Sequence, residues 1–83
     1  MTLEEKRTRV KEILAQADKL KGKFFYLDEN GNLLMNIRLD ILKEIRKLLD
    51  QAQAIDPEDG PTKRKLREAE ESYQVWLKKF MES

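Results

Sequence analysis

The stretch GKFFYLDENGNLLMN, residues 22–36, decides the fold because it is the one part of the chain that lacks the pattern of a helix or a tight turn. Residues 24–27 are aromatic or aliphatic and favour a strand. Residues 28–32, Asp-Glu-Asn-Gly-Asn, have the chemistry of a type I turn in which Gly31 takes the left-handed conformation in a bulge. The stretch therefore predicts a β-hairpin over residues 23–36.

The type I turn determines which residues of the two strands face each other. Leu27 lies opposite Leu33. The next pair on the same face joins Phe25 and Met35. We expect this face to pack on the helices and to close the core, because a two-stranded hairpin is only marginally stable alone. The other face carries the remaining apolar side chains, which are Phe24, Tyr26 and Leu34. A shorter turn at Asn30-Gly31 is the alternative, and it would exchange the faces of one strand.

A first helix is expected over residues 3–21. Thr2 and Glu5 have the spacing of a capping box, in which the hydroxyl and the carboxylate each accept a hydrogen bond from a free backbone amide. Apolar residues recur along this segment at the three- and four-residue spacing of an amphipathic helix. Gly22 then has the residue type of a left-handed helix stop.

Two more helices are expected after the hairpin. Asn36 is the predicted N-cap of a helix over residues 37–55, which is apolar on two sides and should contact both other helices. The turn 56–60 is short enough to force an antiparallel return. A third helix follows over residues 61–81, with Pro61 at its first position. We therefore predict one mostly α domain, a three-helix bundle with a β-hairpin between helices 1 and 2, in the order α-β-β-α-α.

The composition excludes much of the common chemistry of proteins. The chain has no cysteine and no histidine, so it lacks disulfides and the commonest general base and metal ligand. A balance of 17 basic against 16 acidic residues gives a net charge of +1, which is too small to steer the whole molecule towards nucleic acid or membrane. The sequence has neither the apolar run of a signal peptide nor the roughly 20 apolar residues of a membrane span. We expect a soluble, non-enzymatic protein without cofactor or metal, cytoplasmic if it is natural.

An apolar surplus around the hairpin is the strongest functional signal in the sequence. The outer face of the hairpin and the start of the second helix carry more large apolar side chains than the core stripes of the helices require. Aromatic and Met side chains are enriched in protein interfaces. We therefore expect a protein-binding patch, formed by Phe24, Tyr26, Leu34, Met35 and Leu39. The alternative is that the hairpin lies flat between the helices and buries them, because so small a chain needs its large residues for the core.

A basic segment at the start of the third helix indicates a second class of function. Positive charge there opposes the helix macrodipole, and a broken local rule can mark a functional site. The residues that would contact phosphates or an acidic partner are Lys63, Arg64, Lys65 and Arg67. This alternative, a small nucleic-acid-binding or phage-type regulatory protein, predicts strongly salt-dependent binding. A third alternative is a designed monomer without a partner.

Over its whole length the chain resembles computationally designed small helical proteins. The features that carry the resemblance are the TLEEK start, the Gly that follows Lys21, the DENGN turn, the DPEDGP connection and the lack of Cys and His. The resemblance is one of style and includes no specific motif. Because such proteins are often made as binders, it implies recognition of another protein. The Gln-rich segment LDQAQAID fits this style less well and also suits a small natural regulatory protein.

Overall fold

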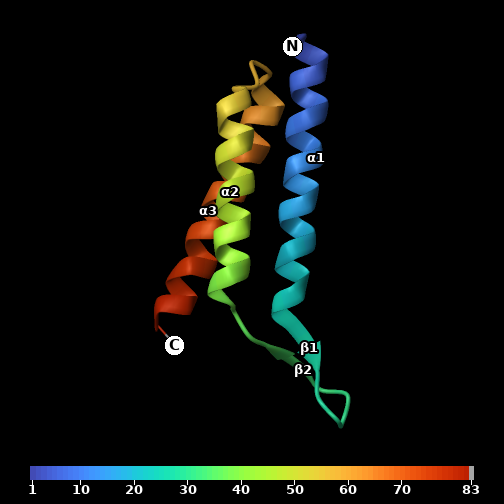
Figure 1. The fold of residues 1–83 in the computed structure, drawn as a ribbon, viewed down its shortest axis with the longest axis vertical. Helices are drawn as coiled ribbons and strands as arrows, with labels where there is room; N and C mark the ends of the chain where they lie inside the picture. The colour runs from blue at the N-terminus through green and yellow to red at the C-terminus, as the bar shows by residue number, and fades with distance from the viewer. Residues whose placement is uncertain (83) are drawn as a thin grey trace.

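The computed structural model describes residues 1–82, which form three α-helices and one two-stranded antiparallel sheet (Figure 1). The elements in chain order are α1 (Leu3–Lys21), a short 3-10 turn η1 (Gly22–Phe24), β1 (Phe25–Leu27), β2 (Leu33–Met35), α2 (Leu39–Ile55) and α3 (Gly60–Glu82). This arrangement confirms the predicted α-β-β-α-α order, with the hairpin between the first two helices.

The first helix begins as its sequence indicates but ends differently. The Thr2 hydroxyl accepts a hydrogen bond from the Glu5 backbone amide at 3.1 Å, which is one half of the predicted capping box. At the other end, Gly22 is right-handed, with φ −59° and ψ −24°, so the prediction of a left-handed stop is wrong. The backbone instead tightens into η1, which carries the chain one further turn before the first strand starts at Phe25.

The second helix begins at Leu39, two residues later than predicted, and Asn36 is not its N-cap. The reason is that the Asn36 amide donates to the Phe24 carbonyl at 2.6 Å, which keeps Asn36 at the base of the hairpin. Arg38 takes the N-cap position in an extended conformation, without a side-chain cap. Its carbonyl accepts the first helical hydrogen bond, from the Leu42 amide at 3.1 Å.

Two aspartates determine the shape of the connection between α2 and α3. Asp56 ends α2 in the left-handed conformation, with φ 53°. Asp59 then caps α3, because its carboxylate accepts hydrogen bonds from the Thr62 backbone amide, at 2.9 Å, and from the Thr62 hydroxyl. The helix consequently begins at Gly60, so Pro61 lies at the second position and not at the first. Pro61 is tolerated there because the amides of the first turn have no partner within the helix.

This cap predicts a loss of stability in acid. The Thr62 hydroxyl and amide hold the pKa of the Asp59 carboxyl below its usual value of 3.8, and the charge of Arg7 adds to the effect. A pKa that is lowered by folding gives stability that is present above the usual pKa and is lost as the pH falls through the folded value. We therefore expect Asp59→Asn to lower the melting temperature at neutral pH, and this deficit to shrink towards zero well below pH 3.8.

Thermal unfolding followed by circular dichroism over a pH series checks this expectation. Glu71→Gln, on the exposed face of α3, is the control for removing one carboxylate. If the melting-temperature deficit of Asp59→Asn stays constant across the acid range, the ionised cap does not contribute to stability.

The core lies between the three helices, with α2 at its centre. Helix α2 contacts both α1 and α3, as its two-sided apolar pattern predicts. The buried apolar side chains come from all three helices and from η1: Val10, Ile13, Ala17, Phe24, Ile41, Leu42, Ile45, Leu49, Ala52, Leu66 and Tyr73. The molecule is elongated along the helix axes, with extents of 49 × 24 × 19 Å (Figure 1).

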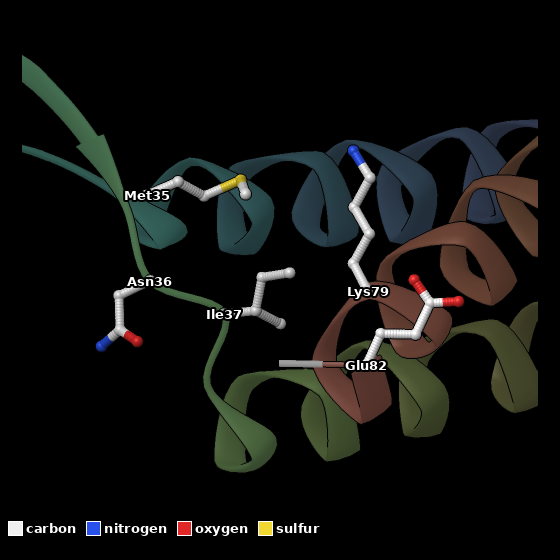
Figure 2. Close-up of a pocket in the computed structure, with 5 residues that line it drawn as sticks. All are labelled: Met35, Asn36, Ile37, Lys79 and Glu82. Atoms are coloured by element: carbon white, nitrogen blue, oxygen red, sulfur yellow. The ribbon is translucent and has the colours of Figure 1, made fainter.

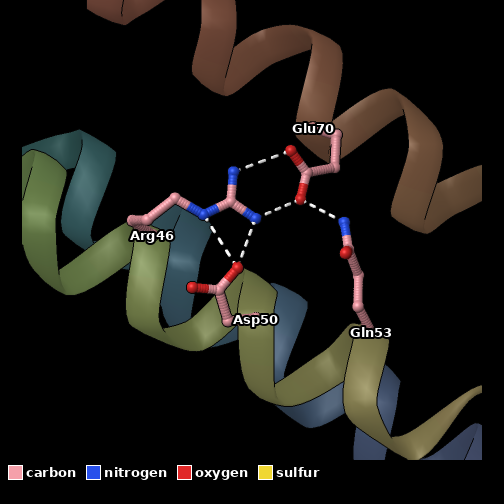
Figure 3. Close-up of polar contacts among 4 residues, drawn as sticks. All are labelled: Arg46, Asp50, Gln53 and Glu70. Carbon is pink, nitrogen blue, oxygen red and sulfur yellow. Dashed lines mark hydrogen bonds and ion pairs between the residues drawn. The ribbon is translucent and has the colours of Figure 1, made fainter.

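A polar cluster joins α2 to α3 beside this core (Figure 3). Arg46 donates from Nη1 to Glu70 Oε2 at 2.8 Å, and its other terminal nitrogen contacts the second oxygen of the same carboxylate. Arg46 Nε also donates to Asp50 at 3.0 Å, and Gln53 donates to Glu70. The guanidinium lies 5.0 Å from the centre of the Tyr73 ring. The Glu70 carboxylate raises the pKa of Arg46, so the guanidinium keeps its positive charge at every ordinary pH.

Because both members of this pair are mostly shielded from solvent, we expect a measurable coupling between them. In a double-mutant cycle with Arg46→Met and Glu70→Gln, the coupling free energy should be about 1 kcal/mol and only partly reduced by salt. Urea unfolding of the four proteins measures it. The matched control is the exposed pair Arg9 and Glu12, 3.4 Å apart on α1, for which we expect under about 0.5 kcal/mol. Equal couplings in the two cycles would contradict the expectation.

Candidate functional site: the hairpin

The hairpin projects past the end of α1 and the start of α2, and no helix runs alongside its tip (Figure 1). Its register pairs Phe25 with Met35 and Leu27 with Leu33, as the type I turn predicts. Tyr26 pairs with Leu34 between them. The alternative of a shorter Asn-Gly turn is therefore wrong.

The turn at the tip is held by one carboxylate. Asp28 Oδ1 accepts hydrogen bonds from the backbone amides of Asn30, at 2.9 Å, and Asn32, at 2.8 Å. The Asn32 side chain donates to the other oxygen at 3.1 Å. These hydrogen bonds, those of Asn32 first, lower the pKa of the Asp28 carboxyl below 3.8. Gly31 supplies the left-handed residue of the turn, with φ 80°. The hairpin is thus pre-organised by its own sequence.

Both faces of the hairpin are open to solvent. Its apolar side chains, together with the first residue of α2, are between 39% and 68% exposed. We call these seven residues the hairpin surface: Phe25, Tyr26, Leu27, Leu33, Leu34, Met35 and Leu39. The prediction that one face, with Phe25, Leu27, Leu33 and Met35, closes the core is wrong. Only the base of that face meets a helix, where Phe25 packs on Trp76. The strands then run on beyond the helix ends, so no core is available for Leu27 and Leu33 to cover (Figure 1).

Phe24 is the one aromatic residue of the segment that turns inwards. It is 0% exposed, and its ring centre lies 5.4 Å from that of Trp76 at an angle of 48°. The prediction that Phe24 shares an exposed face with Tyr26 and Leu34 is therefore wrong. Phe24 belongs to η1 and not to the strand, so the alternation of side chains along a strand does not determine its direction.

The base of the hairpin is anchored on the last turns of α3. Phe25 packs edge-on against Trp76, with the ring centres 5.9 Å apart, and Lys79 Nζ lies 5.2 Å from the centre of the same indole ring. Figure 2 shows Met35 and Ile37 turned towards the end of α3, across a shallow pocket from Lys79. The base is therefore fixed to the bundle, whereas the tip has no support from it.

The structure brings together most of the residues predicted to bind a protein and adds others. Tyr26, Leu34, Met35 and Leu39 are all exposed at this end of the molecule. Sequence reasoning missed the neighbours of these residues on the opposite face: Phe25, Leu27 and Leu33. The exposure of these three residues could have been foreseen from the expected helix lengths. The third helix was expected to be only slightly longer than the second, so its end can reach the base of the hairpin but not its tip.

The basic segment lies at the other end of the bundle, on the first turns of α3 (Figure 1). Lys63, Arg64, Lys65 and Arg67 are exposed. Across residues 1–82 none of the four takes part in an ion pair. They are thus separate from the hairpin surface, and their contact with phosphates stays a prediction.

The same described part of the chain contains neither a group of possible metal ligands nor a helix that could cross a membrane. No three acidic side chains within residues 1–82 come together as the ligands of a metal ion would. None of the helices in that range has the length and apolar character needed to cross a membrane. Comparison of the chain with protein-family models, with curated proteins and with solved structures finds no match.

Proposed function

We propose that this chain is a non-enzymatic protein-binding module and that the hairpin surface is its binding site. The observation that carries the proposal is the exposure of six large apolar side chains on the projecting hairpin, with Leu39 exposed beside them at the start of α2. Single exposed apolar residues are common on protein surfaces, but a contiguous apolar patch marks an interaction site. The aromatic rings of Phe25 and Tyr26 and the flexible Met35 are the side-chain types that interface centres favour.

The size of the hairpin surface suits a protein partner. Over the two faces of the hairpin and Leu39 together, its side chains expose on the order of 700 Å², so a partner that contacts both faces would approach the roughly 800 Å² per partner of an interface of standard size. Charged residues stand at its margins, among them Lys23, Glu29, Arg38 and Asp40, all of them exposed. An apolar centre with a charged rim is the usual composition of such a site.

The rigidity of the turn also supports the proposal. The Asp28 carboxylate already makes three hydrogen bonds within the free hairpin. The anchoring of Phe25 on Trp76 fixes the other end. Because the hairpin is ordered before it meets a partner, binding costs less conformational entropy. The free energy gained by burying Tyr26 and the tip leucines then contributes to the affinity.

Site-specific photo-cross-linking tests the proposal. A photoreactive residue in place of Leu27, on the hairpin, should form covalent adducts with protein in a cell lysate or in the purified sample. The control is the same residue in place of Val75, which is exposed and apolar but stands on α3 and not on the hairpin. Adducts that are no more abundant at position 27 than at position 75 would overturn the proposal.

A further inference from the structure

We propose that the partner of the hairpin surface is a second copy of this chain, bound so that the two hairpins lie antiparallel, with the tip of each against the base of the other. This inference rests on the proposed function, because it concerns the same surface. Two observations carry it. One is the distribution of free charge along the hairpin, and the other is the apolar area together with the direction in which the hairpin points.

The hairpin has an acidic tip and a basic base. At the tip, Asp28 is occupied by the turn, whereas Glu29 is exposed and has no ion pair within the described residues 1–82. At the base, Arg38 is paired with Asp40 at 2.7 Å, whereas Lys23 is exposed and likewise without an ion pair in that range. Among the described residues, one unpaired negative charge therefore stands at the tip of the hairpin and one unpaired positive charge at its base.

This polarity is self-complementary in only one orientation. A twofold axis brings residue i of one copy to residue j of the other and, by symmetry, j to i. Antiparallel hairpins place Glu29 of each copy beside Lys23 of the other. Hairpins aligned tip to tip would instead bring like charges together, which is unfavourable. The separation is suitable, because the strands rise about 3.3 Å per residue and the tip lies roughly 15–20 Å from the base.

The apolar face of the hairpin completes the contact. The tip pair, Leu27 and Leu33, is the most exposed part of the hairpin surface. In the antiparallel arrangement it packs on the parts of Phe25 and Met35 of the second copy that α3 leaves exposed, which share its face. The tip leucines, which the bundle of their own chain leaves uncovered, are then covered by the base of the other hairpin.

The direction of the hairpin keeps the two bundles apart in this arrangement. It points away from the bundle along the long axis (Figure 1), so two hairpins can overlap while the two bundles lie at opposite ends of the dimer. The shared face supplies on the order of 450 Å² per copy, which is the range of weak interfaces. We therefore expect a reversible dimer that forms at micromolar concentrations.

Exchanging the charges at positions 23 and 29 tests the orientation. Sedimentation velocity over a wide range of protein concentrations, at low ionic strength, measures dimerisation. Wild type should show a concentration-dependent dimer. Glu29→Lys alone and Lys23→Glu alone should each weaken it about 3- to 10-fold. An equimolar mixture of the two variants should form a heterodimer of restored affinity, because both cross-chain pairs are again of opposite charge. The chain with both substitutions should also dimerise.

Two controls define the outcomes. Glu71→Lys makes the same charge change at an exposed position in the middle of α3, and should leave the dimer unchanged. Leu27→Gln should abolish dimerisation without changing the helix content. A wild type that stays monomeric overturns the dimer, and cross-linking of position 27 to other proteins would then still support the proposed function. A dimer that is insensitive to the charge changes overturns the antiparallel arrangement, and one that survives Leu27→Gln overturns the site.

Discussion

Replacement of Phe24 by alanine is expected to destabilise the protein by about 3–5 kcal/mol. The ring is fully buried and packs on Trp76 where η1 meets the end of α3. Its removal costs the transfer energy of a whole aromatic side chain and leaves a cavity, and it deletes an aromatic contact. A chain of 83 residues has a total stability of roughly 4–12 kcal/mol. The substitution should therefore lower the melting temperature by about 15–25 °C.

Urea unfolding followed by far-ultraviolet circular dichroism measures this effect. The matched control is Tyr26→Ala, two residues later, where an exposed aromatic ring is removed. We expect that variant to change the free energy of unfolding by less than about 1 kcal/mol. Similar losses for the two variants would mean that the ring of Tyr26 is as important to the core as that of Phe24, contrary to the structure.

Excision of the hairpin should abolish partner binding while the helices remain folded. The Phe24 carbonyl and the Asn36 amide are already joined at 2.6 Å. A short Gly-Ser linker can therefore replace residues 25–35 without moving either end. The residues removed are mostly exposed, so the stability should change by no more than about 1 kcal/mol, chiefly through loss of the Phe25 contact with Trp76. A shorter loop also costs slightly less closure entropy.

A photoreactive residue in place of Leu39 allows the same assay in both proteins, because Leu39 is exposed beside the hairpin and is retained on excision. Its protein adducts, whether with a second copy or with another protein, should disappear when the hairpin is removed. Circular dichroism should show unchanged helix content. Persisting adducts would place the binding site on α2, and unfolding of the excised chain would show that the hairpin is part of the cooperative core.

The hairpin shows how much of the fold is determined by interactions between residues that are close in the sequence. Its register was predictable because the turn is determined by Asp28 and Gly31, which act on their nearest neighbours. The three helices were predictable for a similar reason, since apolar periodicity and caps are local patterns. The start of α2 was misplaced because the preference of Asn36 for a helix cap competed with its hydrogen bond to Phe24, which depends on a contact across the hairpin.

The sequence by itself determined the number and order of the helices, the hairpin and its register, and the central position of α2. Only the tertiary structure decided which aromatic residue is buried and which are free. Strand alternation gives two faces but cannot say whether a helix lies beside either of them. Here α1 ends before β1 starts and α2 begins only after β2 has ended, so both faces of the hairpin stay exposed. The extra turn of η1 directs Phe24 into the core, where α3 presents Trp76 to receive it.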